Sequence, residues 1–427
     1  MPASELDGDL TWLFARQRFG IKPGLERVQA LLTRLGRPER AFDAVLVGGT
    51  NGKGSCSSTL ASIMTRSGRR TGLFTSPHLT HFSERFSVGG AQLPDEDLLS
   101  GLAAVRPHAE ALEATFFEIV TALACVVFAR AGAELVIMEV GLGGRFDATN
   151  ALSPRLSVIT GVALDHTDIL GDTVGEIAAD KAGIMRPGIL TLTGAVGDAL
   201  EVIEDAARKL GATLWAVGHD ISVDARDLGW SGLRCRVSSP LGRVDVTTPL
   251  LGLHQAPNVA LAVVAAQVLG APVAALQAGA AQTRWPGRLE PLPWRDRTFL
   301  LDGAHNPQAA LALALALRRL EVVPVKLIFG TTRDKNVPEM VAALEPCVTE
   351  VVVTRARLSP RAASPETLTL YWSVPTLVAE TPEAALALAY ARSSPGEVVV
   401  VAGSLYLIGE VRPLLLGTEL EPWERFQ

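Results

Sequence analysis

The sequence has few cysteines and no long apolar run. Its four cysteines are far apart in the 427 residues and form no CxxC pair, which argues against a zinc ribbon, a thioredoxin-like motif and a disulfide scaffold. No apolar stretch reaches the ~20 residues of a membrane-spanning helix. Met1–Arg16 is acidic and lacks the apolar core of a signal peptide. We therefore expect a cytoplasmic protein without a membrane partner.

Aromatic residues and excess charge are also scarce. Aromatics make up 5% of the chain, and 39 Lys and Arg against 45 Asp and Glu give a net charge of −6. No basic stretch is interleaved with aromatics, which argues against a nucleic-acid partner. No repeat of fixed period and no heptad pattern is visible, so we expect a monomer. A hydrophobic content of 48% supports a sizeable core, and at ~100–200 residues per domain the length predicts two domains.

Short apolar runs alternate with longer Ala- and Leu-rich segments. The patterns predict strands at 42–47, 134–140 and 156–162, with helices at 56–66 and 119–130. Strands that are apolar on both faces indicate a parallel sheet covered by helices on both sides. Residues 211–249 alternate weakly and predict a small antiparallel element.

The Pro-rich segment Trp285–Arg297 reads as an interdomain linker and hinge. Beyond it the pattern predicts strands at 298–301, 325–329, 350–354 and 397–401, and helices at 307–320 and 384–392. The fold class is therefore α/β. We predict a P-loop NTPase-like parallel-sheet ATPase domain over residues 1–290, followed by a smaller Rossmann-like α/β domain over residues 291–427.

A glycine-rich turn, GGTNGKGS over residues 48–55, joins the first predicted strand to a helix. Glycines let a phosphate approach the backbone, N–H groups meet it at the helix N-terminus, and Lys53 and Ser55 would serve the phosphate oxygens and Mg²⁺. The strict pattern GxxxxGK[ST] is not met, because Gly54 separates Lys53 from Ser55. The position between strand and helix nevertheless favours phosphate binding over a simple turn.

Three further side chains leave two interpretations open. Glu139 closes an apolar strand and His166 follows the next one, where an open parallel sheet binds its ligands. Taken alone, each is also typical of ordinary structural residues, and imidazole is an unusual ligand for Mg²⁺. Lys181 lies in the last turn of a helix opened by the capping box Thr173–Glu176, where a lysine complements the helix dipole.

Nine motifs together resemble the dihydrofolate synthase/folylpolyglutamate synthase family of the Mur ligase superfamily. They occur in this order: GTNGKGS (49–55), LFTSPHL (73–79), TFFE (115–118), EVGLGGRFDATN (139–150), DHTDILGDT (165–173), DKAGI (180–184), WPGRLE (285–290), LDGAHNP (301–307) and DKN (334–336). The resemblance covers roughly residues 20–410. LFTSPHL and EVGLGGRFDATN are far more specific than the phosphate loop.

The resemblance implies a role for each matching residue. It implies ATP contacts from Asn51, Gly52, Lys53, Gly54, Ser55, Asn258, Arg288, Asp302 and His305. It implies two Mg²⁺ sites held by Ser55, Ser76, Glu139, His166 and a carbamate on Lys181, and catalytic roles for Lys53, His166 and Lys181. It implies substrate contacts from Thr115, Phe116, Phe117, Glu118, Phe146, Asp147 and Ala148, and Ser404 is our candidate for the glutamate pocket.

The implied reaction is ATP-dependent ligation of L-glutamate to the carboxylate of dihydropteroate or of a reduced folate. The expected small-molecule partners are these substrates and ATP. A Mur-type ligase that joins an amino acid to a UDP-sugar peptide is one alternative, and a non-enzymatic P-loop nucleotide switch is another. The sequence leaves open how the enzyme divides its work between adding the first glutamate and extending the chain.

Overall fold

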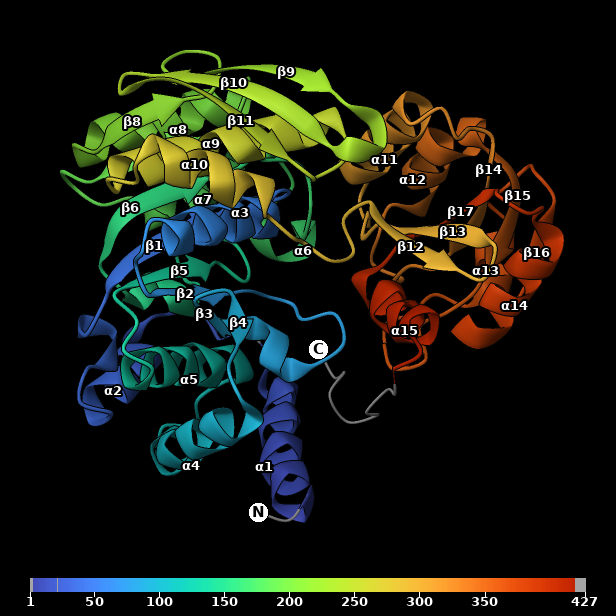
Figure 1. Ribbon diagram of the computed structural model, residues 1–427. Helices are drawn as coiled ribbons and strands as arrows, with labels where there is room; N and C mark the ends of the chain where they lie inside the picture. Colours follow the sequence, from blue (N-terminus) through green and yellow to red (C-terminus); the bar gives the residue numbers. More distant parts are fainter. Residues whose placement is uncertain (1–2, 21, 419–427) are drawn as a thin grey trace.

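The computed structural model describes residues 3–20 and 22–418, which form two α/β lobes (Figure 1). The strands of the first lobe are β1 Asp43–Gly48, β2 Thr71–Phe74, β3 Phe86–Val88, β4 Ala91–Gln92, β5 Leu135–Glu139, β6 Pro154–Ile159, β7 Leu190–Thr193, β8 Thr213–Ala216, β9 Ser222–Asp227, β10 Leu233–Ser239 and β11 Gly242–Thr248. Its α-helices are α1 Ala3–Ala15, α2 Glu26–Arg34, α3 Lys53–Arg66, α4 Asp95–Ala111, α5 Phe116–Arg130, α6 Thr167–Leu170, α7 Val174–Lys181, α8 Asp198–Leu210, α9 Ala256–Val268 and α10 Val273–Ala281.

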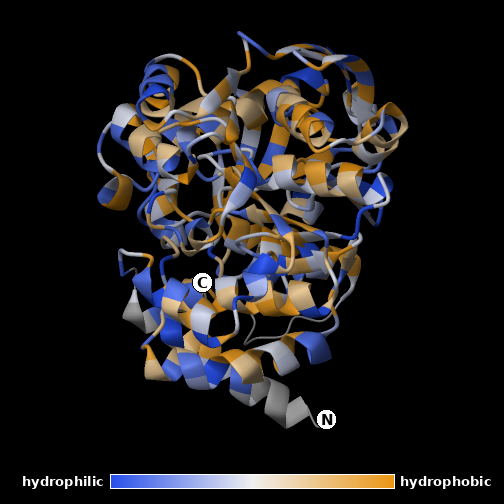
Figure 2. Ribbon diagram, turned by 90° about the vertical axis from the view of Figure 1, so that its left-hand side faces the viewer, coloured by the Kyte–Doolittle hydropathy of each residue, from blue (hydrophilic) through white to orange (hydrophobic). Residues whose placement is uncertain are grey.

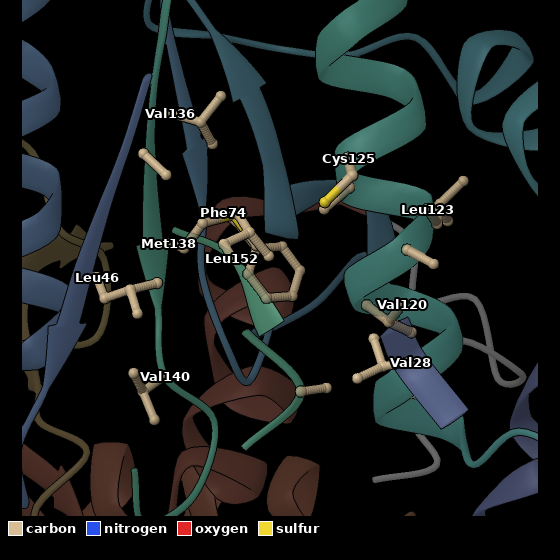
Figure 3. Packing of buried hydrophobic residues seen from close by; sticks show 14 of the residues in the cluster. Val28, Leu46, Phe74, Val120, Leu123, Cys125, Val136, Met138, Val140 and Leu152 are labelled. Carbon is tan, nitrogen blue, oxygen red and sulfur yellow. The ribbon is translucent and has the colours of Figure 1, made fainter. Parts of the chain in front are cut away.

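The main sheet of the first lobe has the order β4-β3-β2-β5-β1-β6-β7-β8 and is parallel except at β3 and β4. Alternate residues of β1 face opposite sides, and both sides are buried. Ala44 and Leu46 face a layer that includes α2, α4 and α5, whereas Val45 and Val47 face α3, α9 and α10. Figure 3 shows the first of these layers, with Phe74 and Met138 packed toward α5. The predicted parallel sheet with two covered faces is confirmed.

The weakly alternating stretch forms a second, antiparallel sheet in the order β11-β10-β9, which lies over α9 and α10 (Figure 1). In β10, Leu233, Cys235 and Val237 are buried and the residues between them are exposed or partly exposed. This period of two is typical of a strand that covers a core on one face only. The small antiparallel element predicted for residues 211–249 is confirmed.

The second lobe contains a six-stranded sheet in the order β12-β13-β17-β14-β15-β16, parallel except for the β12–β13 pair. Its strands are β12 Glu290–Trp294, β13 Arg297–Leu301, β14 Val325–Phe329, β15 Val348–Val353, β16 Thr376–Val378 and β17 Val398–Ala402. Its α-helices are α11 Pro307–Arg319, α12 Val337–Leu344, α13 Pro365–Thr369, α14 Pro382–Arg392 and α15 Leu405–Leu416. One face packs on α11 and α12 and the other on α14 and α15. In Figure 2 most of the hydrophilic colour lies on peripheral loops and outer helix faces.

The expected linker at Trp285–Arg297 is wrong in its second half. Glu290–Trp294 is the edge strand β12, paired with β13, and only residues 282–289 connect α10 to the second sheet. Pro291 and Pro293 misled the prediction, because proline breaks central strands but is tolerated on an edge strand. In the described part of the chain, no helix is long and apolar enough to cross a membrane.

Candidate active site

One cleft between the lobes, with a volume of about 1150 Å³, collects the residues that the sequence pointed to. Its lining includes Asn51, Gly52, Lys53, Gly54, Ser55, Ser76, Thr115, Phe116, Phe117, Glu118, Glu139, Phe146, Asp147, Ala148, His166, Lys181, Asn258, Arg288, Asp302, His305 and Ser404. The cleft is large enough for a nucleotide and a second ligand together. Candidates from both lobes therefore share a single site.

The order of the first sheet explains this convergence. Strands β2, β5, β1 and β6 are neighbours. In chain order, β2 leads to Ser76, β5 ends in Glu139, β1 leads to Lys53 and β6 leads to His166. Because parallel strands end at the same edge of a sheet, these four side chains gather there.

The turn between β1 and α3 allows close approach to the backbone. Gly52 has a φ of 91°, a left-handed conformation that favours glycine, and a Cβ there would lie under 3.0 Å from the amide of Asn258. Lys53 Nζ donates to the carbonyls of Gly49 at 3.1 Å and Thr50 at 3.2 Å. Together with the N–H groups that open α3, this arrangement can bind the phosphates of a nucleotide.

The additional glycine of this loop has a packing reason. Gly54 lies in the first turn of α3, and a Cβ on it would come under 3.0 Å from three atoms of the Trp285 indole. Trp285 belongs to the segment that connects the lobes. The departure from the strict phosphate-loop pattern therefore lets this segment lie against the loop.

Glu139 and Ser76 form a group suited to a metal ion. The buried Glu139 carboxylate accepts the backbone N–H of Ser76 at 3.1 Å. Burial raises the pKa of Glu139, and the charge of Lys53 opposes this rise. Within residues 3–20 and 22–418, the buried Ser76 Oγ has no hydrogen-bond partner. A buried carboxylate beside an unpaired hydroxyl oxygen fits a hard cation such as Mg²⁺. No group of three or more His, Cys, Asp or Glu side chains that could hold a metal ion occurs among those same residues, so hydroxyls, water or phosphate would complete the coordination.

Lys181 is buried, although it ends a helix. The predicted capping box of Thr173 and Glu176 opens α7 and is confirmed. Lys181 Nζ donates to the Gly49 carbonyl at 3.1 Å. Burial, together with the positive charge of Lys53, lowers the pKa of Lys181 to about 7. A large share of the amine is therefore uncharged near neutral pH, unlike a solvated lysine that complements a helix dipole.

His166 caps the short helix α6 and lies seven positions beyond the last residue of β6, with a φ of 52°. The side chain of His166 is 37% exposed, and its partial burial lowers the pKa of His166 to about 4, while the neighbouring Asp165 opposes this shift. The imidazole is therefore neutral at neutral pH, which is the form that can bind a metal.

The second lobe contributes the loop after β13. Both carboxylate oxygens of Asp302 accept backbone N–H groups, from Leu289 and from Ala304, each at 2.9 Å. A Cβ on Gly303 would collide with the guanidinium of Arg288. Asp302 therefore fixes the loop that carries Arg288 into the cleft. Two more candidates lie near this loop. His305 Nδ1 is 2.8 Å from the Gly303 carbonyl, and Ser404 caps the N-terminus of α15.

The candidate substrate residues at the start of α5 have structural partners as well. Thr115 and Glu118 form a capping box, and Glu118 also pairs with Arg27 at 3.1 Å. Phe116 stacks on Phe14 with centroids 5.7 Å apart. These contacts give the wall of the cleft a fixed shape, so the side chains present an ordered surface to a ligand.

The candidates of the loop after β5 differ in exposure. Phe146 is 53% exposed. The buried Asp147 accepts N–H groups from Gly141, Leu142 and Thr149, and burial raises the pKa of Asp147 while its bonds to Thr149 oppose the rise. Asp147 therefore shapes the loop, and Phe146 is the member with apolar surface available to a ligand.

Sequence reasoning missed the contacts by which the lobes meet here, although Asn51 was already a candidate. Asp165 Oδ1 lies 2.7 Å from Lys335 Nζ, and Asn51 Nδ2 donates to Gln308 Oε1 at 2.7 Å. Asp165 and Lys335 occur in the DHTDILGDT and DKN motifs, but nothing local in either motif indicates that they meet across the cleft. Gln308 has no signal at all in the sequence.

Comparisons with known proteins agree with this architecture. The family described as the Mur ligase middle domain matches residues 47–266, and the one described as the Mur ligase, glutamate ligase domain, matches residues 287–405. The dihydrofolate synthase/folylpolyglutamate synthase of Bacillus subtilis is 35% identical over 438 residues, which cover 95% of this chain and 98% of that protein.

Two other relatives complete the comparison. A probable bifunctional folylpolyglutamate synthase/dihydropteroate synthase of Haloferax volcanii is 37% identical over 420 residues, or 94% of this chain, but the match spans only 50% of that longer protein. The structure of Escherichia coli FolC in complex with DHPP and ADP superposes with a TM-score of 0.89 at 31% identity, covering 98% of this chain and 99% of that one.

Proposed function

This chain belongs to the dihydrofolate synthase/folylpolyglutamate synthase family of the Mur ligases, and from that premise we propose that it joins L-glutamate to a pteroyl carboxylate at the expense of ATP. One observation carries the proposal. The phosphate loop, the Glu139–Ser76 group and the loop of the glutamate ligase domain all line the same cleft. A nucleotide switch needs no second domain with such a loop.

The chemistry has two steps. The pteroyl carboxylate attacks the γ-phosphorus of ATP, which gives an acyl phosphate and ADP. The amine of glutamate then attacks the acyl carbon, and phosphate leaves from a tetrahedral intermediate. Phosphoryl transfer depends mainly on positioning and on charge stabilisation. Lys53 would exchange its two loop carbonyls for phosphate oxygens, and the N-terminus of α3 would receive the remaining charge.

Bound Mg²⁺ would supply further neutralisation of charge on the phosphates. Ser55, Ser76, Glu139 and His166 are the residues that would hold it, and the unpaired Ser76 Oγ supports this assignment. For Lys181 we propose a carbamate. The neutral amine attacks CO₂, a proton is released, and the product is an anionic oxygen donor in place of an ammonium group. A buried Lys181 with a lowered pKa favours this reaction.

The substrate side of the cleft favours a pteroyl group over a UDP-sugar peptide. Phe116 and Phe146 offer aromatic surface for a planar ring system. The Escherichia coli FolC structure contains DHPP and ADP, which is consistent with this arrangement. We propose that both dihydropteroate and reduced monoglutamate folates are substrates, so that the enzyme performs first addition as well as extension.

The test is product analysis by mass spectrometry with dihydropteroate or a reduced monoglutamate folate, each with and without L-glutamate. We expect ADP formation to require both the pteroyl substrate and glutamate, with a mass increase of one glutamyl residue. Lys53→Ala should abolish it, and Lys326→Met, a change of a partly exposed lysine on β14, should not. ATP turnover that ignores both substrates would refute the proposal, and activity on a UDP-sugar peptide alone would favour the alternative ligase.

A further inference from the structure

Among the described residues, two groups that link the lobes across the cleft differ in character. The first is apolar and lies at the connecting segment. Leu79, from the loop after β2, packs so tightly on α15 that a Cβ on Gly409 would collide with its backbone carbonyl. A Cβ on Gly287, in the connecting segment, would lie 3.1 Å from both Leu79 and Ile408. The Leu79 side chain packs against the apolar cluster that contains Ile408, and the contact is continuous with the chain connection.

The second group is polar and centres on Asp165. Its Oδ1 pairs with Lys335 Nζ at 2.7 Å, and its Oδ2 accepts from Asn306 Nδ2 at 3.1 Å and lies 3.5 Å from His305 Nε2. The three partners all belong to the second lobe. The side chains of Asp165 and Lys335 are only 8% and 11% exposed. Lys335 also lies 3.7 Å from Asp334 on its own lobe.

The same polar group reaches the phosphate loop. Asn51 donates to Gln308, and the side-chain amides of Asn51 and Asn306 exchange hydrogen bonds at 3.1 and 3.4 Å. Asn306 therefore contacts Asp165 and the phosphate loop at once. A displacement of the second lobe at this point would therefore also change the hydrogen bonds of the loop that would hold ATP.

The two groups differ in how they respond to separation. Polar partners can exchange their bonds for bonds to water at small net cost, whereas apolar atoms in close contact lose their packing. The polar group is therefore the side that can open, and the apolar group beside the connecting segment is the side that stays closed.

We propose that Asp165 is a positioning residue that, through its pair with Lys335, closes the second lobe onto the phosphate loop, with the apolar contact of Leu79 with α15 and the connecting segment as the pivot. Opening at Asp165 admits the substrates, and re-formation of the pair restores the geometry needed for transfer. Lys335 of the DKN motif thereby holds the second lobe against the first. The kinetic part of this proposal rests on the proposed function, and the structural part does not.

The test uses the full-length protein with Lys335→Met, Asp165→Asn, the double variant and Lys335→Arg. Lys326→Met is the matched control, because Lys326 pairs with Glu397 at 3.1 Å within the second lobe. Small-angle scattering without ligands measures the separation of the lobes. Unfolding by urea gives the coupling free energy between positions 165 and 335. Steady-state kinetics gives kcat and KM separately.

We expect Lys335→Met to increase the radius of gyration and to lower kcat at least tenfold, while Lys335→Arg restores most of both and Lys326→Met changes neither. The double variant should lose less stability than the sum of the single variants, because it leaves no buried charge unpaired. Additive effects, or a Lys335→Met protein with wild-type scattering, would overturn the proposal. Scattering and coupling do not depend on activity, so their failure is distinct from a failure of the proposed function.

Discussion

Replacing Gly54 by alanine tests why the phosphate loop carries an extra glycine. A Cβ at this position would lie under 3.0 Å from three atoms of the Trp285 indole, the Nε1 atom at 2.9 Å among them. An indole is a rigid ring and cannot bend away from the contact as the end of a flexible side chain would. The ring, and with it the segment between the lobes, must therefore move.

The size of the effect follows from two opposing terms. Overpacking of this kind costs about 1–3 kcal/mol, and alanine in place of glycine within a helix gains about 0.5–1 kcal/mol. Gly8, in α1, measures the second term alone, because a Cβ there meets nothing within 4 Å. Gly8→Ala should raise the free energy of unfolding. The free energy of unfolding of Gly54→Ala should be about 1–3 kcal/mol lower than that of Gly8→Ala.

The assay is urea unfolding of Gly54→Ala, Gly8→Ala, Trp285→Ala and the Gly54→Ala/Trp285→Ala double variant. Trp285→Ala removes the ring, so the added methyl group should cost nothing in that background, and the two changes should be strongly non-additive. The KM for ATP should rise in Gly54→Ala and partly recover in the double variant. If Gly54→Ala is as stable as Gly8→Ala, or if the effects add, the packing explanation of this glycine is wrong.

Two further predictions address other parts of the cleft. Glu139→Gln should lower kcat at least 100-fold without loss in thermal melting, because a buried carboxylate is costly to desolvate; wild-type turnover would remove Glu139 from the site. Phe146→Ala should raise the KM for the pteroyl substrate about three- to tenfold and leave the KM for ATP unchanged, and equal changes in both would argue against a ring contact.

The sequence was most informative where one local rule decides the structure. The run 42–47 became β1 at Asp43–Gly48 because its residues 44–47 are all apolar and buried, and Glu139 could be located because it ends a similar apolar run. Ends of parallel strands meet at one edge, so the grouping of Glu139 with the phosphate loop followed without any knowledge of contacts. The capping box of α7 was equally local, and it correctly placed Lys181 at the end of that helix.

Burial and contact across the cleft could not be predicted in the same way. A lysine at a helix terminus is ordinarily solvated, and only the tertiary packing that buries Lys181 lowers its pKa. The pairing of Asp165 with Lys335 spans 170 residues, and no periodicity connects two such positions. The prolines of β12 led to the opposite kind of error. They predicted a loop, but the segment pairs with β13 at the edge of the sheet.

The glycines of the phosphate loop show how these two kinds of information combine. Gly52 needs its left-handed φ for the turn itself, which a motif can indicate, but a Cβ there is also excluded by Asn258 of α9. At Gly54 the three atoms nearest to an added Cβ all belong to Trp285. Each of these two glycines thus leaves room for a different part of the chain beside the surface that would bind the phosphates. The loop departs from the strict pattern because it contacts the connecting segment as well as forming a candidate phosphate site, so a shift of that segment would act directly on the nucleotide site.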